Sequence, residues 1–171
     1  MIIADATVLI ALAKTGRLGL LRELYGDAGV GPEVKAEVVE GGTEMRAPEV
    51  SVIEAAFEAK WLREIVPTAG ERRVARRILK SSRLHEGEAE AIALASSRGA
   101  MVLLDDKEAR LVAETTGVHY MGTAGVVLHA FFRGKLDFAE LEATIHDLSR
   151  VIWLSPEVVA EILRRGREAG R

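Results

Sequence analysis

The sequence predicts an α/β protein in which helices cover both faces of a parallel sheet. Two short apolar runs, 1–4 and 101–104, stop at acidic residues, and each is followed by the periodic apolar pattern of a helix. Apolar runs of this length are typical of parallel strands that are buried on both faces. A residue directly after such a strand lies at the carboxyl edge of the sheet, where open α/β proteins bind ligands. Asp5, which ends the first run, is therefore the first candidate for a functional residue.

Composition indicates one globular domain that can bury a sizeable core, since the chain has 171 residues of which 49% are hydrophobic. Cysteine, asparagine and glutamine are absent, and arginine supplies 17 of the 23 basic residues. The lack of cysteine excludes disulfides and zinc–thiolate sites, and the lack of thermolabile amides suggests a thermophilic source. No apolar stretch approaches the roughly 18 residues that cross a bilayer, and the N-terminus lacks a signal-peptide pattern. We therefore expect a cytoplasmic protein with no membrane association.

In the first half of the chain, helical and strand-like patterns alternate. Gly16 interrupts the first helical pattern, so that stretch forms either one kinked helix or two short ones. Pro32 opens the next helix and the pair Gly41-Gly42 ends it. Glu37 lies beside the apolar stripe of that helix, where an acid is either half-buried or directed at a site. The expected elements are a strand at 1–4, helical segments at 6–14 and 18–24, a weak strand at 28–31, helices at 33–40 and 48–60, and a strand at 61–66.

The second half continues this alternation and ends in helices. We treat residues 1–171 as a single domain with a core at 1–134 and a C-terminal helical extension at 135–171. The expected elements are helices at 71–83 and 86–95, a strand at 101–104, a helix at 107–116, a strand at 118–120, a helix at 126–132 opened by a glycine-rich turn, and two amphipathic helices in the extension.

Basic residues are concentrated in the predicted helix at 71–83. Residues 70–83 carry a local charge of +5, which leaves −8 for the rest of the chain. Five residues recur at helical spacing and mostly share one face: Arg72, Arg73, Arg76, Arg77 and Lys80. Such a stripe is either a solvated helix surface or a surface that contacts phosphates.

Further acids lie where they could join Asp5. At 100° per residue, Glu88 falls on the stripe that faces the sheet, although it could also simply occupy the first turn of its helix. Asp105 and Asp106 follow the second buried strand. Asp105 with Glu108 resembles a capping box, which leaves Asp106 without an obvious structural role. Thr123 is more often a helix N-cap than a ligand, although a helix start with glycines beside an acidic metal site could also hold a phosphate.

Together these residues suggest a metal site. Several carboxylates within a few ångströms cannot all remain ionised without a cation. Oxygen donors without cysteine or a set of histidines favour Mg²⁺ or Mn²⁺ over Zn²⁺. Such ions can bind phosphate and activate water, which suits hydrolysis of phosphodiesters. The expected set is Asp5, Glu37, Glu88 and Asp106, with Asp105 in reserve.

Five segments in this order resemble the PIN-domain family, most closely small prokaryotic proteins related to VapC-type toxins. Each motif is weak alone, but the order and spacing match over essentially the whole chain. The segments are 2–14, 32–38, 87–95, 103–106 and 122–125, and the tail at 155–170 also resembles that branch.

The resemblance implies a PIN fold with sheet order 3-2-1-4-5 and a Mg²⁺- or Mn²⁺-dependent ribonuclease. By position, Asp5, Glu37 and Asp106 match the first, second and fourth metal-binding acids, and Thr7 matches a hydroxyl near the metal. Glu88 stands where VapC-type proteins usually have aspartate, and Ala109 replaces a common aromatic residue.

Three interpretations remain open. The first is a ribonuclease that acts on single-stranded or structured RNA, with the basic stripe guiding the RNA. The second is a non-catalytic PIN-like module that binds RNA or a partner. The third is a toxin restrained by a small antitoxin protein. A homodimer through the helical tail is a further option.

Overall fold

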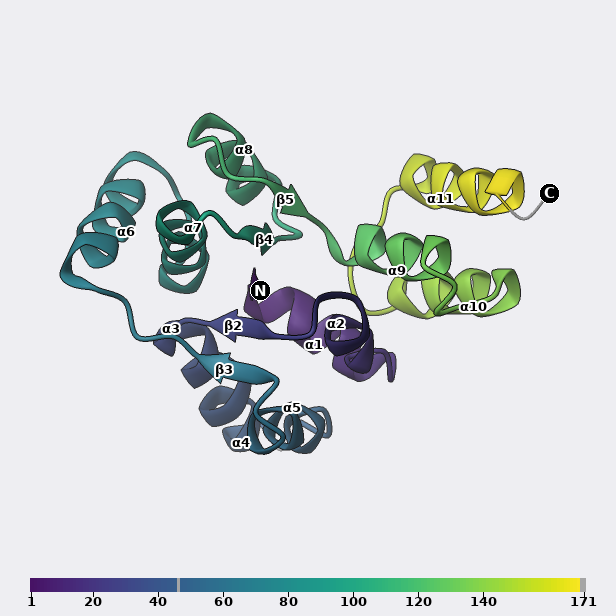
Figure 1. Cartoon of the computed structure of the whole chain (residues 1–171), viewed down its shortest axis with the longest axis horizontal. Coiled ribbons are helices and arrows are strands. Elements are labelled where there is room, and N and C mark those ends of the chain that lie inside the picture. Colours follow the sequence, from purple (N-terminus) through teal and green to yellow (C-terminus); the bar gives the residue numbers. More distant parts are fainter. Residues whose placement is uncertain (46, 170–171) are drawn as a thin grey trace.

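The computed structural model describes residues 1–45 and 47–169 and contains a five-stranded parallel sheet (Figure 1). The strand order, β3-β2-β1-β4-β5, confirms the prediction. Ile2 of the central strand pairs with Ala28 on one side and with Met101 on the other. The strand order changes direction at β1, so the carboxyl end of this strand is the position at which open α/β sheets bind ligands. The strands are β1 (Ile2–Ala4), β2 (Ala28–Val30), β3 (Leu62–Glu64), β4 (Met101–Leu103) and β5 (Tyr120–Met121).

Helices connect the strands to one another, and helices also make up the C-terminal part of the chain. In Figure 1, α6, α7 and α8 lie at one end of the view, and α9, α10 and α11 lie at the other. The helices are α1 (Ala6–Lys14), α2 (Gly19–Tyr25), α3 (Pro32–Lys35), the π-helical turn η1 (Ala36–Gly41), α4 (Gly42–Glu44), α5 (Val50–Glu58), α6 (Ala69–Ser81), α7 (Glu86–Arg98), α8 (Lys107–Thr115), α9 (Thr123–Phe132), α10 (Phe138–Leu148) and α11 (Pro156–Ala169). None of the described helices is both long enough and apolar enough to cross a membrane.

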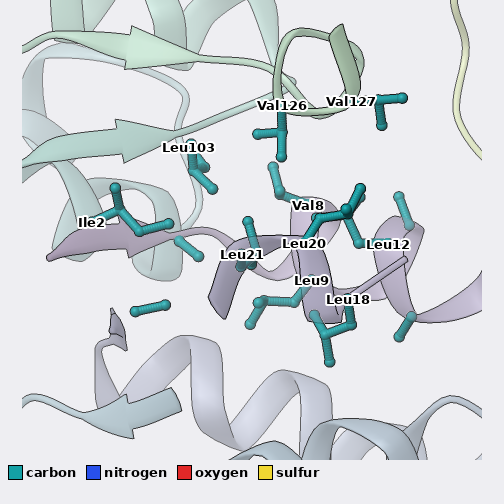
Figure 2. Close-up of a cluster of buried hydrophobic side chains, with 14 of the residues drawn as sticks. Ile2, Val8, Leu9, Leu12, Leu18, Leu20, Leu21, Leu103, Val126 and Val127 are labelled. Atoms are coloured by element: carbon teal, nitrogen blue, oxygen red, sulfur yellow. The ribbon is translucent and has the colours of Figure 1, made fainter. Parts of the chain in front are cut away.

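The strands divide their side chains between two hydrophobic clusters, one on each face of the sheet. Ile2 and Leu103 belong to the cluster that contains α1, α2 and α9 (Figure 2). Ile3 and Val102 belong to the cluster that contains α7 and α8. Because successive side chains of a strand point to opposite faces, β1 and β4 each contribute to both clusters. The continuous apolar runs of β1 and β4 are therefore required by burial on both faces.

The C-terminal helices pack on α9 and extend the first cluster. Leu141 and Ile145 of α10 and Ile162 of α11 are buried there. At Gly166 of α11, an added Cβ would lie 2.7 Å from a methyl carbon of Leu141, so glycine permits this close approach. Gly170 and Arg171, at the end of the predicted extension, lie outside the described residues.

Two local predictions are resolved or corrected by the structure. The first helical stretch is two helices, and Gly16 between them has φ 67°, a left-handed conformation that favours glycine. The prediction that Gly41-Gly42 ends a helix is wrong, because the chain passes from η1 directly into α4. Gly42 instead allows close packing, since a Cβ there would lie 2.5 Å from a methyl carbon of Val50.

Candidate active site

A hollow of about 520 Å³ lies at the carboxyl end of the central strand. Asp5 and Thr7 reach it from the start of α1, Glu37 from η1, and Glu88 from the first turn of α7. The structure therefore brings together three of the acids that the sequence predicted, from segments far apart in the chain. The remaining lining residues are Glu33, Ala36, His85, Glu86 and Gly87.

Asp5 is the most deeply buried acid of this hollow, with 4% of its surface exposed. It is the N-cap of α1, and its Oδ1 accepts a hydrogen bond from the Ala6 N–H at 2.7 Å. Burial raises the pKa of Asp5 to about 7, the backbone hydrogen bonds oppose this shift, and repulsion from Glu88 and Glu37 adds to it. A buried carboxylate beside two further acids is suited to bind a cation.

Glu88 is half-buried and faces the same group of charges. Burial raises the pKa of Glu88, and repulsion from Asp106 and Glu37 raises it further. Its Oε2 accepts the backbone N–H of His85 at 2.9 Å, so the side chain also caps the helix that carries it. The structural and functional interpretations of Glu88 are thus both compatible with its position.

Glu37 lies at the mouth of the hollow and is exposed. It belongs to the π-helical turn, and such turns are frequent at functional sites. Gly87 allows the first turn of α7 to pass close to this segment. A Cβ at Gly87 would lie 3.2 Å from a methyl carbon of Val34 and 3.9 Å from Glu37 Oε2.

The structure assigns the cap of α8 to a different aspartate than the sequence predicted. Asp106, not Asp105, caps α8, and its Oδ1 accepts the Ala109 N–H at 2.9 Å. Asp105 instead accepts the Thr123 N–H at 2.8 Å and lies 3.3 Å from an Arg110 nitrogen. These partners direct Asp105 toward α9, so it is the weaker candidate for a metal ligand. Asp106 is exposed and close enough to Glu88 to raise its pKa.

The two predicted hydroxyls have different positions. Thr7 is exposed and lines the hollow beside Asp5. Thr123 is fully buried, and its hydroxyl donates to Asp105. The N-cap of α9 is Gly122, so the expectation that Thr123 is the cap is wrong. Thr123 supports the carboxyl end of β4 from within the core.

The donor set of the hollow fits a hard divalent cation. Carboxylates and a threonine hydroxyl supply only oxygen, which Mg²⁺ and Mn²⁺ prefer. A cation would also relieve the repulsion that raises the pKa of Asp5. In residues 1–45 and 47–169, no three acidic or histidine side chains yet converge closely enough to hold an ion. Glu37 lines the same hollow and is exposed, so its side chain can adopt other rotamers.

The predicted basic stripe lies on α6, which packs against α7. Arg73, Arg76, Arg77 and Lys80 are exposed and line a hollow of about 400 Å³. Arg72 is also exposed, but its guanidinium donates to the Pro67 carbonyl. A short connection, residues 82–85, joins the end of α6 to the start of α7. Along the chain, this connection leads from the end of α6 to His85, which lines the acidic hollow.

Sequence reasoning did not single out His85, Glu33 or Glu86 as lining residues. His85 is the N-cap of α7 and its side chain is exposed. Its charge interaction with Glu88 partly opposes the rise in the pKa of Glu88. One feature of the sequence could have identified His85: it stands one residue before a helix whose first turn carries a candidate acid. Glu33 occupies the corresponding first turn of α3.

The fold and the hollow define a class of protein: a parallel α/β/α domain with carboxylates gathered at the end of its central strand. A family model described as "PIN domain" matches residues 1–168, and the chain belongs to this family. PIN domains are typically metal-dependent nucleases. No curated protein and no solved structure gave a significant match to the chain.

Proposed function

We propose that this protein is an endoribonuclease that uses Mg²⁺ or Mn²⁺ to hydrolyse phosphodiester bonds of RNA. The observation that carries the proposal is the convergence of Asp5, Glu37 and Glu88 on one hollow at the end of β1. Membership of the PIN-domain family supports it, because that family consists typically of metal-dependent nucleases. Burial, with a smaller contribution from repulsion by Glu88 and Glu37, raises the pKa of Asp5, and a cation bound beside Asp5 would offset this destabilisation of its charged form.

Each residue has a distinct role in this proposal. Asp5 and Glu88 hold the ion, and Asp106 completes the set from the start of α8. When bound, the ion neutralises phosphate charge and favours ionisation of water. Glu37 orients the attacking water and accepts its proton. The water oxygen forms a bond to phosphorus while the bond to the leaving ribose oxygen breaks, and the leaving oxygen takes a proton from solvent.

The basic stripe supplies the binding surface for RNA. Four basic side chains on one face of α6 can follow consecutive phosphates, and this contact does not depend on base sequence. The short α6–α7 connection, which ends at His85 of the acidic hollow, supports this assignment. Single-stranded and structured RNA both present such a backbone, so the surface selects for charge rather than for one sequence.

The test is cleavage of a mixed RNA pool with and without Mn²⁺. Wild type is compared with Asp5→Asn and with Asp147→Asn, a matched change at an exposed aspartate of α10. We expect metal-dependent cleavage that is lost in Asp5→Asn and retained in Asp147→Asn. Equal cleavage by wild type and Asp5→Asn would refute the proposal.

A second candidate function is a binding module without catalysis. Two observations favour it: the Glu88 carboxylate already accepts a hydrogen bond at the start of α7, and within residues 1–45 and 47–169 no three acidic or histidine side chains form a ready ion site. This function predicts that folded wild type binds RNA without cutting it, and that Asp5→Asn leaves binding unchanged. A small antitoxin partner and a homodimer through the C-terminal helices remain predictions to be tested by co-purification and by measurement of molar mass.

A further inference from the structure

A second hollow, of about 470 Å³, lies at the opposite end of α1 from the acidic site. Asp5 precedes the first residue of α1 and Lys14 is its last, so the two ends are about 13 Å apart at 1.5 Å per residue. The residues that line this hollow come from the end of α1, from the segment that leads into α5 and from the first turn of α5: Ala13, Lys14, Ala47, Pro48, Glu49 and Val52. None of them belongs to the proposed active site.

Glu49 is the distinctive residue of this hollow because it is a buried carboxylate that is only half satisfied. Only 7% of its surface is exposed. One oxygen, Oε1, lies 3.3 Å from Lys14 Nζ. The other, Oε2, is screened from solvent and has no hydrogen-bond partner among the described residues. A buried hydrogen-bond acceptor without a donor raises the free energy of the folded protein. A ligand that brings a donor to this oxygen removes that cost, which favours its binding.

The surroundings specify a cationic donor. The carbonyl end of α1, where the helix dipole is negative, contributes Ala13 and Lys14 to the hollow. Residues 40–58 contain five glutamates and one arginine, a net charge of −4. Lys14 is 44% exposed and holds Glu49 through one contact, so a cation that replaces this contact leaves the Lys14 ammonium group in solvent and the Glu49 carboxylate paired.

An arginine side chain fits these conditions better than a lysine side chain. A guanidinium presents two parallel N–H donors that match both oxygens of one carboxylate, and it is more weakly hydrated than an ammonium group. Val52, which is 45% exposed, provides an apolar rim that would contact residues flanking the arginine. The acidic surface around the hollow complements a chain that carries further basic residues.

We propose that this hollow binds an arginine of a basic peptide segment from a partner protein. The guanidinium displaces the Lys14 ammonium and donates to both oxygens of Glu49, while apolar residues of the segment pack against Val52. The proposal does not depend on nuclease activity, because the hollow and the acidic site share no residue.

The test uses three display libraries of random peptides that differ only in one central residue: arginine, lysine or norleucine. We expect wild type to enrich basic peptides from the arginine library alone. The best peptide should bind Glu49→Gln at least tenfold more weakly than wild type. Glu54→Gln, an exposed glutamate on the same helix, is the matched control and should change affinity less than twofold. Asp5→Asn should bind the peptide as wild type does.

A second variant covers the case in which Glu49→Gln does not fold. Lys14→Met removes the competing ammonium and should tighten peptide binding several-fold, whereas Lys135→Met, which removes an exposed lysine elsewhere, should not. Enrichment that is equal across the three libraries, or affinity that is unchanged in both Glu49→Gln and Lys14→Met, would overturn the proposal. Arg46 lies outside the described residues, so Arg46→Ala is included. Binding that appears only in that variant would mean that the chain itself supplies the guanidinium. That result would overturn the proposal that a partner protein supplies it.

Discussion

Replacing Asp5 with asparagine is expected to stabilise the metal-free protein at neutral and alkaline pH. Asparagine caps helices as well as aspartate does, so the hydrogen bond to the Ala6 N–H is retained. The change removes the negative charge that burial and repulsion from Glu88 and Glu37 disfavour. Activity and stability should therefore move in opposite directions in this one variant.

The magnitude follows from the pKa of Asp5, which rises from 3.8 to about 7 on folding. The folded state binds the proton more tightly, so this residue lowers the free energy of unfolding as pH rises from about 4 to about 7. A difference of about 3 pH units corresponds to an upper limit of about 4 kcal/mol above pH 7. Below pH 4 the carboxyl group is neutral in both states, and the variant should gain little.

The assay is urea unfolding of wild type and Asp5→Asn in a chelator at pH 4 and pH 8. Asp147→Asn controls for the general effect of losing one carboxylate. Mn²⁺ at about 100 times its dissociation constant should stabilise wild type by about 2.7 kcal/mol and leave Asp5→Asn almost unchanged. A variant that is no more stable than wild type at pH 8, or equally stabilised at both pH values, would refute the reasoning.

Three further predictions concern other parts of the molecule. Burial raises the pKa of Glu71, but hydrogen bonds from Ser97, Thr68 and Arg98 outweigh it and lower the pKa to about 2. Glu71→Gln should therefore lose about 3 kcal/mol of stability above pH 4.5, with the difference vanishing as pH falls toward 2, and thermal unfolding of this variant and of Glu54→Gln across that range checks it. Gly87→Ala should reduce cleavage severalfold with little loss of stability, since the added methyl presses on the segment that carries Glu37; Gly70→Ala, where the nearest atom is 3.8 Å away, is the kinetic control. Alanine at Arg73, Arg76 and Arg77 should lower the slope of log affinity against log salt concentration by about 2 for single-stranded RNA. An unchanged slope would exclude the stripe as the RNA surface.

Much of the fold could be predicted from the sequence because its signals are local. The runs at 1–4 and 101–104 are apolar throughout, and the structure shows that their side chains alternate between two buried clusters. The failure at Gly41-Gly42 has a tertiary cause. Glycine there serves the packing of α4 against Val50, and this contact cannot be recognised from neighbouring residues.

The candidate site was only partly predictable for the same reason. Asp5 follows from its place after the first strand, and Glu88 from its helical phase. The pair Asp105 and Asp106 could not be assigned, because the deciding partner, Thr123, lies 18 residues further along the chain. Glu49 gave no signal at all, since its contact with Lys14 joins two segments that are far apart in the chain.

The sequence by itself determined the order of strands and helices, the carboxylates at the strand and helix ends, and the basic stripe of α6. These features depend on periodicity and residue type within short windows. Only the tertiary structure decided which acids share a hollow, which aspartate caps α8, and where a carboxylate is left half satisfied. Those outcomes depend on contacts between distant segments, and burial together with charge repulsion at such contacts gives Asp5 its raised pKa.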